Sequence, residues 1–351
     1  MTSPSVSRGT RRSQDKPKRL PTYVSNILIF GLFMRIIFLM SQRIELFDVD
    51  VPKKNEQPCA YAINEYIISN PLYTVQFGGK SISIIVIFLF SALIYLLFNL
   101  FFKISGDFII PFVFSLYFVF DKVSYSIFLM NPSILVVSMF IVFGFNLQRD
   151  YLSCMNSILS AVLIILMFVS CVIVAIIRID YLVPLLFSFV LTVSTSSKKS
   201  GSPFSFNVLL KTIQVLVFSA ILLFLSSLVV VLTIQYMQLP KFSINFQKSY
   251  LAHEFLSHNH NFLIILYLLF AIVFRRSSVD YEYSEILFIS SILAIINPIN
   301  CYISGPGSDI LIIKIFILSF CGSIASGTRS LILPILIIAS IPLIEFSFCF
   351  Q

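Results

Sequence analysis

The stretch ISIIVIFLFSALIYLLFNL, residues 82–100, decides the fold. It contains no charged side chain, and its length is close to the ~20 apolar residues with which a helix crosses the hydrocarbon core of a bilayer. A second uninterrupted run covers residues 215–232. A transmembrane β-barrel would instead need shorter segments in which apolar and polar residues alternate. These runs therefore predict an all-α fold, a polytopic bundle of transmembrane helices.

The composition of the chain excludes a soluble protein. Hydrophobic residues make up 58% of the sequence, charged residues only 11%, and the mean hydropathy is +0.96, which would leave large apolar patches on any soluble surface. The net charge of +8 does not indicate a nucleic-acid partner, because basic residues gather in the tail from Arg8 to Arg19 and at the ends of apolar runs. That distribution is typical of membrane orientation signals.

Apolar runs and polar breaks alternate along the chain and predict about 9–12 spans. The runs cover residues 23–40, 82–102, 108–120, 125–145, 155–177, 181–195, 209–235, 261–274, 285–299, 310–325 and 331–349. With the N-terminus in the cytosol, the cytosolic breaks all carry a basic residue, as the positive-inside rule expects: Lys103, Arg149, Lys198, Arg275 and Arg329. We therefore predict a cytosolic basic tail over 1–22 and a single transmembrane domain over 23–351, with a luminal loop at 41–81 and a luminal segment at 237–260.

The loop at 41–81 contains two features of interest. Asp48 and Asp50 directly follow the first span, where paired carboxylates can hold a divalent cation or act on a polar headgroup, or can be a solvated pair beside Lys53 and Lys54. Further along, Ala62, Glu65 and Tyr66 fall on one face of a short helix that ends at residues 70–73. This pattern predicts an amphipathic helix at the membrane surface.

The cysteine and histidine residues do not define a site. Of the six cysteines, only Cys59 and Cys301 lie on the predicted luminal side, where a disulfide between them stays an open alternative. The three histidines, His253, His258 and His260, share one luminal segment without a second cluster of ligands. We expect no metal site and no cofactor.

Several segments, in order along the chain, resemble one protein family. They are the membrane segment that carries Arg35, then Arg43-Ile44-Glu45, the short helix with Glu65 that ends in Pro71-Leu72-Tyr73, Asn131-Pro132-Ser133-Ile134-Leu135, Tyr181-Leu182-Val183-Pro184-Leu185, and the helical stripe Tyr250, Glu254, His258 and Phe262. This order is similar to PIG-U, the many-spanned subunit of the glycosylphosphatidylinositol (GPI) transamidase. The resemblance covers most of the chain and implies a helical arrangement like that of the GT-C glycosyltransferases.

The resemblance implies a noncatalytic subunit in the endoplasmic reticulum membrane, which helps to bind and present the GPI lipid or the precursor protein. Its partners would be the other transamidase subunits, including a caspase-like cysteine protease. The implied lipid-binding residues are Asn245, Tyr250, Glu254, His258, Phe262, Asn297, Asn300 and Asp309. The implied contact residues of the luminal loop are Arg43, Glu45, Asp48, Asp50, Glu65 and Tyr73. No residue of the chain is expected to be catalytic.

Two other functions stay open at this point. The chain also resembles the GT-C mannosyltransferases of the GPI pathway, the PIG-M type, in which Asp48 or Asp50 would act as a base or a metal ligand. A lipid transporter or flippase would use polar side chains in mid-membrane, for which Arg35 and Lys314 are the candidates.

Overall fold

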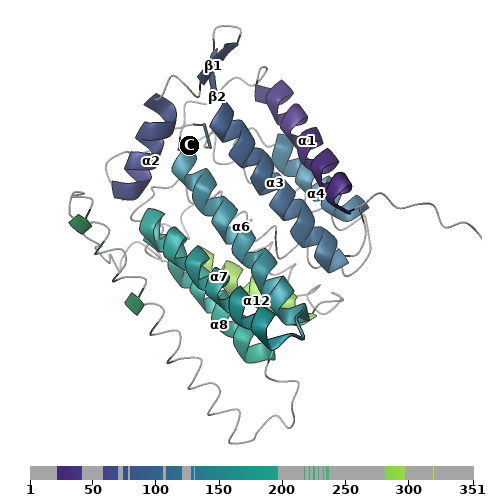
Figure 1. Ribbon diagram of the computed structural model, residues 1–351, viewed down its shortest axis with the longest axis vertical. Helices are drawn as coiled ribbons and strands as arrows, with labels where there is room; N and C mark the ends of the chain where they lie inside the picture. The colour runs from purple at the N-terminus through teal and green to yellow at the C-terminus, as the bar shows by residue number, and fades with distance from the viewer. Residues whose placement is uncertain are drawn as a thin grey trace, which may run out of the picture.

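The computed structural model describes eight stretches of the chain and a few isolated positions. The stretches are residues 22–41, 58–69, 74–77, 80–105, 108–120, 128–129, 131–196 and 281–296. Their elements are α1 (Thr22–Ser41), α2 (Pro58–Ser69), β1 (Thr74–Phe77), β2 (Lys80–Ser83), α3 (Ile84–Ser105), α4 (Ile109–Phe120), α6 (Pro132–Ser153), α7 (Ser157–Ile177), η3 (Ile179–Tyr181), α8 (Leu182–Ser196) and α12 (Tyr281–Ile296). The described residues are almost entirely helical (Figure 1). The predicted segment 237–260 and the runs 261–274 and 331–349 lie outside them.

Three of these helices are long and apolar enough to cross a membrane. They span Ile84–Ile104, Pro132–Ser153 and Ser157–Ile177. Shorter apolar helices cover Asn26–Leu39, Ile109–Phe120 and Leu182–Thr192. The predicted helical class is therefore confirmed for the described part of the chain, and its composition and helix lengths are compatible with a membrane protein.

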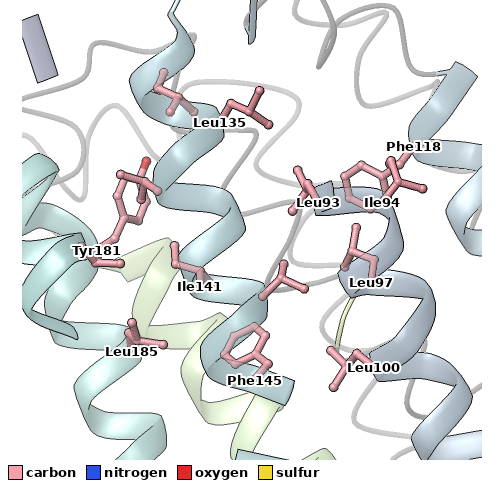
Figure 2. Close-up of a cluster of buried hydrophobic side chains, with 14 of the residues drawn as sticks. Leu93, Ile94, Leu97, Leu100, Phe118, Leu135, Ile141, Phe145, Tyr181 and Leu185 are labelled. Atoms are coloured by element: carbon pink, nitrogen blue, oxygen red, sulfur yellow. The ribbon is translucent and has the colours of Figure 1, made fainter. Parts of the chain in front are cut away.

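Helix α6 forms the centre of the described bundle. It packs against α3 on one side and against α7 and α8 on the other (Figure 1). As a result, 72% of the most apolar 18-residue stretch of α6 is buried, compared with 39% of the corresponding stretch of α7. Figure 2 shows Ile141 and Phe145 of α6 between Leu97 of α3 and Leu185 of α8, in a cluster of fully buried side chains. The core therefore lies along α6 from Pro132 to Gln148.

A glycine permits the close approach of α8 to α6. A Cβ atom at Gly144 would lie 3.0 Å from Cζ of Phe189 and 3.4 Å from Cδ1 of Leu185. Small residues at a helix interface allow dispersion contacts across the shortest interaxial distances. A side chain at position 144 would therefore require the Phe189 ring to shift.

Helices α3 and α6 run parallel. Asn99 pairs with Asn146 and Lys103 pairs with Asp150, both with a separation of 47 residues. A constant separation over one helical turn requires two helices that point the same way. Because α4 contacts α3 and lies between the two helices in sequence, it supplies the return path.

Two local features differ from the sequence-based expectation. A predicted span at 125–145 is instead α6 at Pro132–Ser153, because Pro132 begins the helix and the polar residues near its end stay helical and packed. In addition, β1 and β2 form an antiparallel hairpin with Phe77 opposite Lys80, and β2 continues directly into α3. The sequence between them, Gly78-Gly79, is typical of a two-residue hairpin turn.

Candidate functional site

Most of the predicted site residues lie outside the described residues. This applies to the implied lipid-binding residues Asn245, Tyr250, Glu254, His258, Phe262, Asn297, Asn300 and Asp309, and to the loop residues Arg43, Glu45, Asp48, Asp50 and Tyr73. Only Glu65 is described, and its side chain is exposed on α2. The described part of the candidate site therefore consists of α2 and the elements that contact it.

Three buried polar residues join α2 to the beginning of α6. The Asn64 Nδ2 atom donates a hydrogen bond to Asn131 Oδ1 across 2.8 Å, and the Ser133 hydroxyl donates to the same oxygen across 2.5 Å. In return, Asn64 Oδ1 accepts from the Ser133 backbone N–H across 2.8 Å. The three side chains, here named the amide cluster, are at most 8% exposed.

The amide cluster follows from the way α6 begins. Pro132 stands in the first turn of the helix, where its missing N–H costs nothing, and Asn131 is the N-cap residue. The Asn131 side chain makes no capping bond of its own, although asparagine is among the best capping residues. Asn64 caps the helix instead, by accepting from the unpaired N–H of Ser133. One helix end is thus satisfied by a side chain 69 residues away in sequence.

The two faces of α2 have different environments. Ala60, Asn64 and Ile67 are buried against the bundle, whereas Ala62, Glu65 and Tyr66 are exposed. The predicted sharing of one face by these last three residues is confirmed. The outward face also carries large side chains, since Tyr61 is 52% and Tyr66 59% exposed. A helix with tyrosines pointing away from the protein is suited to the headgroup level of a bilayer or to a protein partner.

A buried cation lies at the same end of the bundle. Arg178, at the end of α7, is 2% exposed, and its guanidinium carbon is 5.4 Å from the ring centroid of Tyr181. The position at the C-terminus of a helix stabilises a positive charge, and the tyrosine ring adds a cation–π contact. Because α2 contacts both α6 and α7, Arg178, Tyr181 and the amide cluster belong to one end of the bundle, named here the α2 end.

The opposite end of α6 carries a second set of polar contacts. Lys103 Nζ forms an ion pair with Asp150 at 2.8 Å, and the two side chains are 30% and 41% exposed. One turn earlier, Asn99 donates to Asn146 Oδ1 across 3.3 Å, while Asn146 Nδ2 donates to the Leu96 carbonyl across 3.0 Å. These contacts hold α3 and α6 in register.

Further hydrogen bonds attach α8 and α12 to the same part of α6. Gln148 Nε2 donates to the Ser188 hydroxyl across 2.5 Å, and the Tyr283 hydroxyl donates to the Phe145 carbonyl across 2.9 Å. Gln148 is fully buried, and within the described part of the chain its Oε1 atom has no hydrogen-bond partner. The polar residues of α6 therefore serve mainly to join neighbouring helices.

The described residues offer neither a metal site nor an activated thiol. Within the ranges given above, no three side chains of His, Cys, Asp or Glu come together. Cys59 on α2 carries a free thiol, and burial raises its pKa above the ordinary value for cysteine. A raised pKa lowers the fraction of reactive thiolate at neutral pH. Cys301, the other half of the disulfide considered above, lies outside the described residues.

Sequence reasoning missed Asn64, Ser133 and Arg178 as members of a site. Asn64 lies on the face of α2 opposite Ala62 and Glu65, and a polar residue on an otherwise apolar helix face was the available signal. Asn131 was considered only as part of a resemblance, although an asparagine before a proline is itself a helix-start signal. Arg178 lies between the apolar runs 155–177 and 181–195, and nothing in that short sequence indicates its burial.

Comparison of the chain with known protein families, characterised proteins and solved structures finds no match. The resemblance to PIG-U therefore rests on the segments themselves. Three of these segments are described: α2, the beginning of α6 from Asn131 to Leu135, and the stretch from Tyr181 to Leu185. All three lie at the α2 end.

Proposed function

We propose that this protein is a noncatalytic membrane subunit of the GPI transamidase, which helps to bind and present the GPI lipid or the precursor protein. The observation that supports this proposal best is the meeting of the resembling segments at the α2 end. Asn64 and Asn131 are 67 residues apart and share a buried hydrogen bond. Segments that form one working surface are expected to meet in space, and α2 does meet the beginning of α6.

The proposal includes a polytopic bundle with a GT-C-like arrangement and a cytosolic N-terminus, in the endoplasmic reticulum membrane. The Lys103–Asp150 ion pair supports the proposed alternation of spans. This ion pair brings together the C-terminal ends of α3 and α6. The basic residues Lys103 and Arg149 assign both of these ends to the cytosolic side of the membrane. The α2 end is then luminal, where GPI attachment takes place.

In this mechanism the chain recognises its ligand and makes no bond. The outward face of α2 offers Tyr61, Glu65 and Tyr66 to the headgroup level, and the amide cluster fixes the position of that face relative to the spans. Rigid presentation reduces the entropy that is lost when a flexible lipid and a second subunit are brought together. Bond formation is assigned to the caspase-like cysteine protease of the complex.

Depletion of the chain tests this proposal against a mannosyltransferase. Loss of a transamidase subunit should cause complete GPI lipid to accumulate, while reporter precursors keep their C-terminal signal. Loss of a mannosyltransferase should instead cause accumulation of GPI intermediates that lack mannose. Complementation with Asp48→Ala sharpens the test, because a noncatalytic subunit needs no base at that position. Mannose-deficient intermediates with this variant, at a normal protein level, would overturn the proposal.

Affinity purification in a mild detergent tests the partner assignment. The intact chain should co-purify with a caspase-like cysteine protease and further membrane subunits. A Tyr61→Ala, Tyr66→Ala double variant should weaken this recovery, or the transfer of the GPI lipid, because both exposed rings are removed while the buried face of α2 is unchanged. The matched control is Ala62→Ser on the same exposed face. Isolation of the intact chain alone would contradict the proposed role.

A further inference from the structure

Helices α3 and α6 share a sequence pattern at the register in which they are paired. The hydrogen bonds from Asn99 to Asn146 and from Lys103 to Asp150 both join residues 47 positions apart. At that same spacing, buried or half-buried residues of α3 recur with the same identity in α6: Ile87, Ser91, Ile94, Phe98, Asn99 and Leu100 correspond to Ile134, Ser138, Ile141, Phe145, Asn146 and Leu147. Because the contacts fix the spacing, the matches do not depend on a choice of alignment.

Two of the shared residues also make the same local contact. The Ser91 hydroxyl donates to the Ile87 carbonyl, and the Ser138 hydroxyl donates to the Ile134 carbonyl, each across 2.7 Å. Both serines are fully buried. An apolar composition explains recurring Ile, Leu and Phe, but it does not explain a serine and an asparagine at equivalent positions of both helices.

The similarity extends to the helical hairpins that contain α3 and α6. Both helices have 22 residues. Each is separated from the following helix by three residues, 106–108 or 154–156, and each packs against that helix, which is α4 or α7. The hairpins α3–α4 and α6–α7 therefore have the same architecture, and their first helices lie side by side and parallel (Figure 1).

We infer that α3–α4 and α6–α7 are two copies of one helical hairpin, and that the asparagine carried by both copies fixes their register. An asparagine pair in an apolar helix interface is satisfied at one relative position, since a slip of one turn moves each amide about 5 Å away from its partner. The charge one turn later has opposite sign in the two copies, as Lys103 and Asp150, and favours the same register. This inference goes beyond the proposed function and does not depend on it.

The two copies differ at the end where α2 is attached. Asn131 and Ser133 are bonded to Asn64 of α2. The equivalent positions of α3 are Ile84 and Val86, which have neither an amide nor a hydroxyl side chain. The attachment of α2 thus uses residues of the second copy that have no counterpart in the first.

Disulfide crosslinking of the full chain in membranes measures the register. The pair Ala92→Cys with Met139→Cys lies seven residues before the asparagines, at the same spacing of 47 residues. The control pair, Ala92→Cys with Val136→Cys, lies almost one turn out of register. With the native cysteines changed to serine, the first pair should crosslink roughly five-fold faster than the control pair, because a disulfide tolerates only a narrow range of Cα separations.

Replacing both asparagines tests their role in the register. Asn99→Leu with Asn146→Leu keeps the interface apolar and should reduce the ratio of the two crosslinking rates to about two, because only a partly exposed ion pair then opposes a slip. The protein level should be unchanged. The matched control is Ser91→Ala with Ser138→Ala, which removes the other shared polar pair. Each of these serines bonds within its own helix, so the ratio should stay the same.

Exchange of the charges tests whether the two positions are equivalent. Lys103→Asp or Asp150→Lys alone places like charges opposite each other and should slow the crosslink between positions 92 and 139. Both changes together should restore the rate to within about two-fold of the parent chain. Equal rates for the two cysteine pairs, a ratio that survives loss of both asparagines, degradation of the double-leucine variant, or a charge exchange that fails to restore the rate would overturn the inference. None of these measurements involves GPI attachment, so the proposed function keeps its own test.

Discussion

The two ends of α6 are held by different chemistry. At the α2 end, neutral amide and hydroxyl groups are buried and bonded to one another, and they hold a helix that has only one face against the bundle. At the other end, buried amides of Asn146 and Gln148 also join helices, but the outermost contact is a charged pair that remains partly exposed and links two helices already packed by apolar side chains. Formal charge is therefore a poor guide to which end of α6 is more firmly held. Burial without access to water raises the cost of breaking a contact more than charge does.

Asn131→Ala should cause the largest loss. It removes the oxygen that accepts from Asn64 and from Ser133. Each of these two buried donors left without a partner costs about 1–3 kcal/mol, so we expect a loss of roughly 2–6 kcal/mol in the free energy of unfolding. Unfolding in mild detergent measures the stability, and limited proteolysis of residues 41–81 reports the release of α2. The matched control is Ser138→Ala, which removes a buried hydroxyl that bonds only within α6, to Ile134. Equal losses for both variants would contradict this account.

Breaking the ion pair should have a smaller effect. Lys103→Met and Asp150→Asn should each reduce the free energy of unfolding by about 0.2–1 kcal/mol, because water screens a pair that is 30% and 41% exposed. The loss should shrink in high salt. A double-mutant cycle at low and high ionic strength measures the coupling. A coupling that exceeds the loss from Asn131→Ala would reverse the comparison of the two ends.

The smallest expected effect is kinetic and concerns the attachment of α2. Since burial raises the pKa of Cys59, its thiolate fraction at a given pH is lower than that of an exposed cysteine. Maleimide should therefore modify Cys59 several-fold more slowly than a cysteine from Ala62→Cys, and the rate should keep rising at more alkaline pH. Both are measured in a chain whose other cysteines are serine. Asn131→Ala should accelerate the Cys59 reaction, and an unchanged rate would mean that α2 stays in place without the amide cluster.

Much of the described fold could be predicted from apolar runs, because a helix of membrane length needs only a continuous apolar sequence. The limits of α3, α7 and α8 agree with prediction within a few residues. The prediction for α6 ended too early, because Asn146 and Gln148 are polar but are packed and hydrogen-bonded to neighbouring helices. The prediction of a polar luminal loop at 41–81 does not include the hairpin, although Gly78-Gly79 is a turn signal.

The candidate site was harder to predict than the fold. The exposed face of α2, with Glu65 and Tyr66, followed from helical periodicity alone. The pairing of Asn64 with Asn131 could not be predicted in the same way. It joins residues 67 positions apart, and a local sequence pattern carries no information about a contact over that separation. Arg178 was missed for a related reason. The burial of Arg178 depends on how α7 and η3 pack, and the local sequence does not predict that packing.

The parallel arrangement of α3 and α6 has a consequence for biosynthesis. Asn99 and Lys103 leave the ribosome 47 residues before Asn146 and Asp150, which takes roughly 2–9 s at the usual ~5–20 residues per second. During that interval the polar side chains of α3 are without their final partners. If α3 spans a membrane, as its length and composition allow, Asn99 and Lys103 would need another polar environment until α4 and α6 have been made.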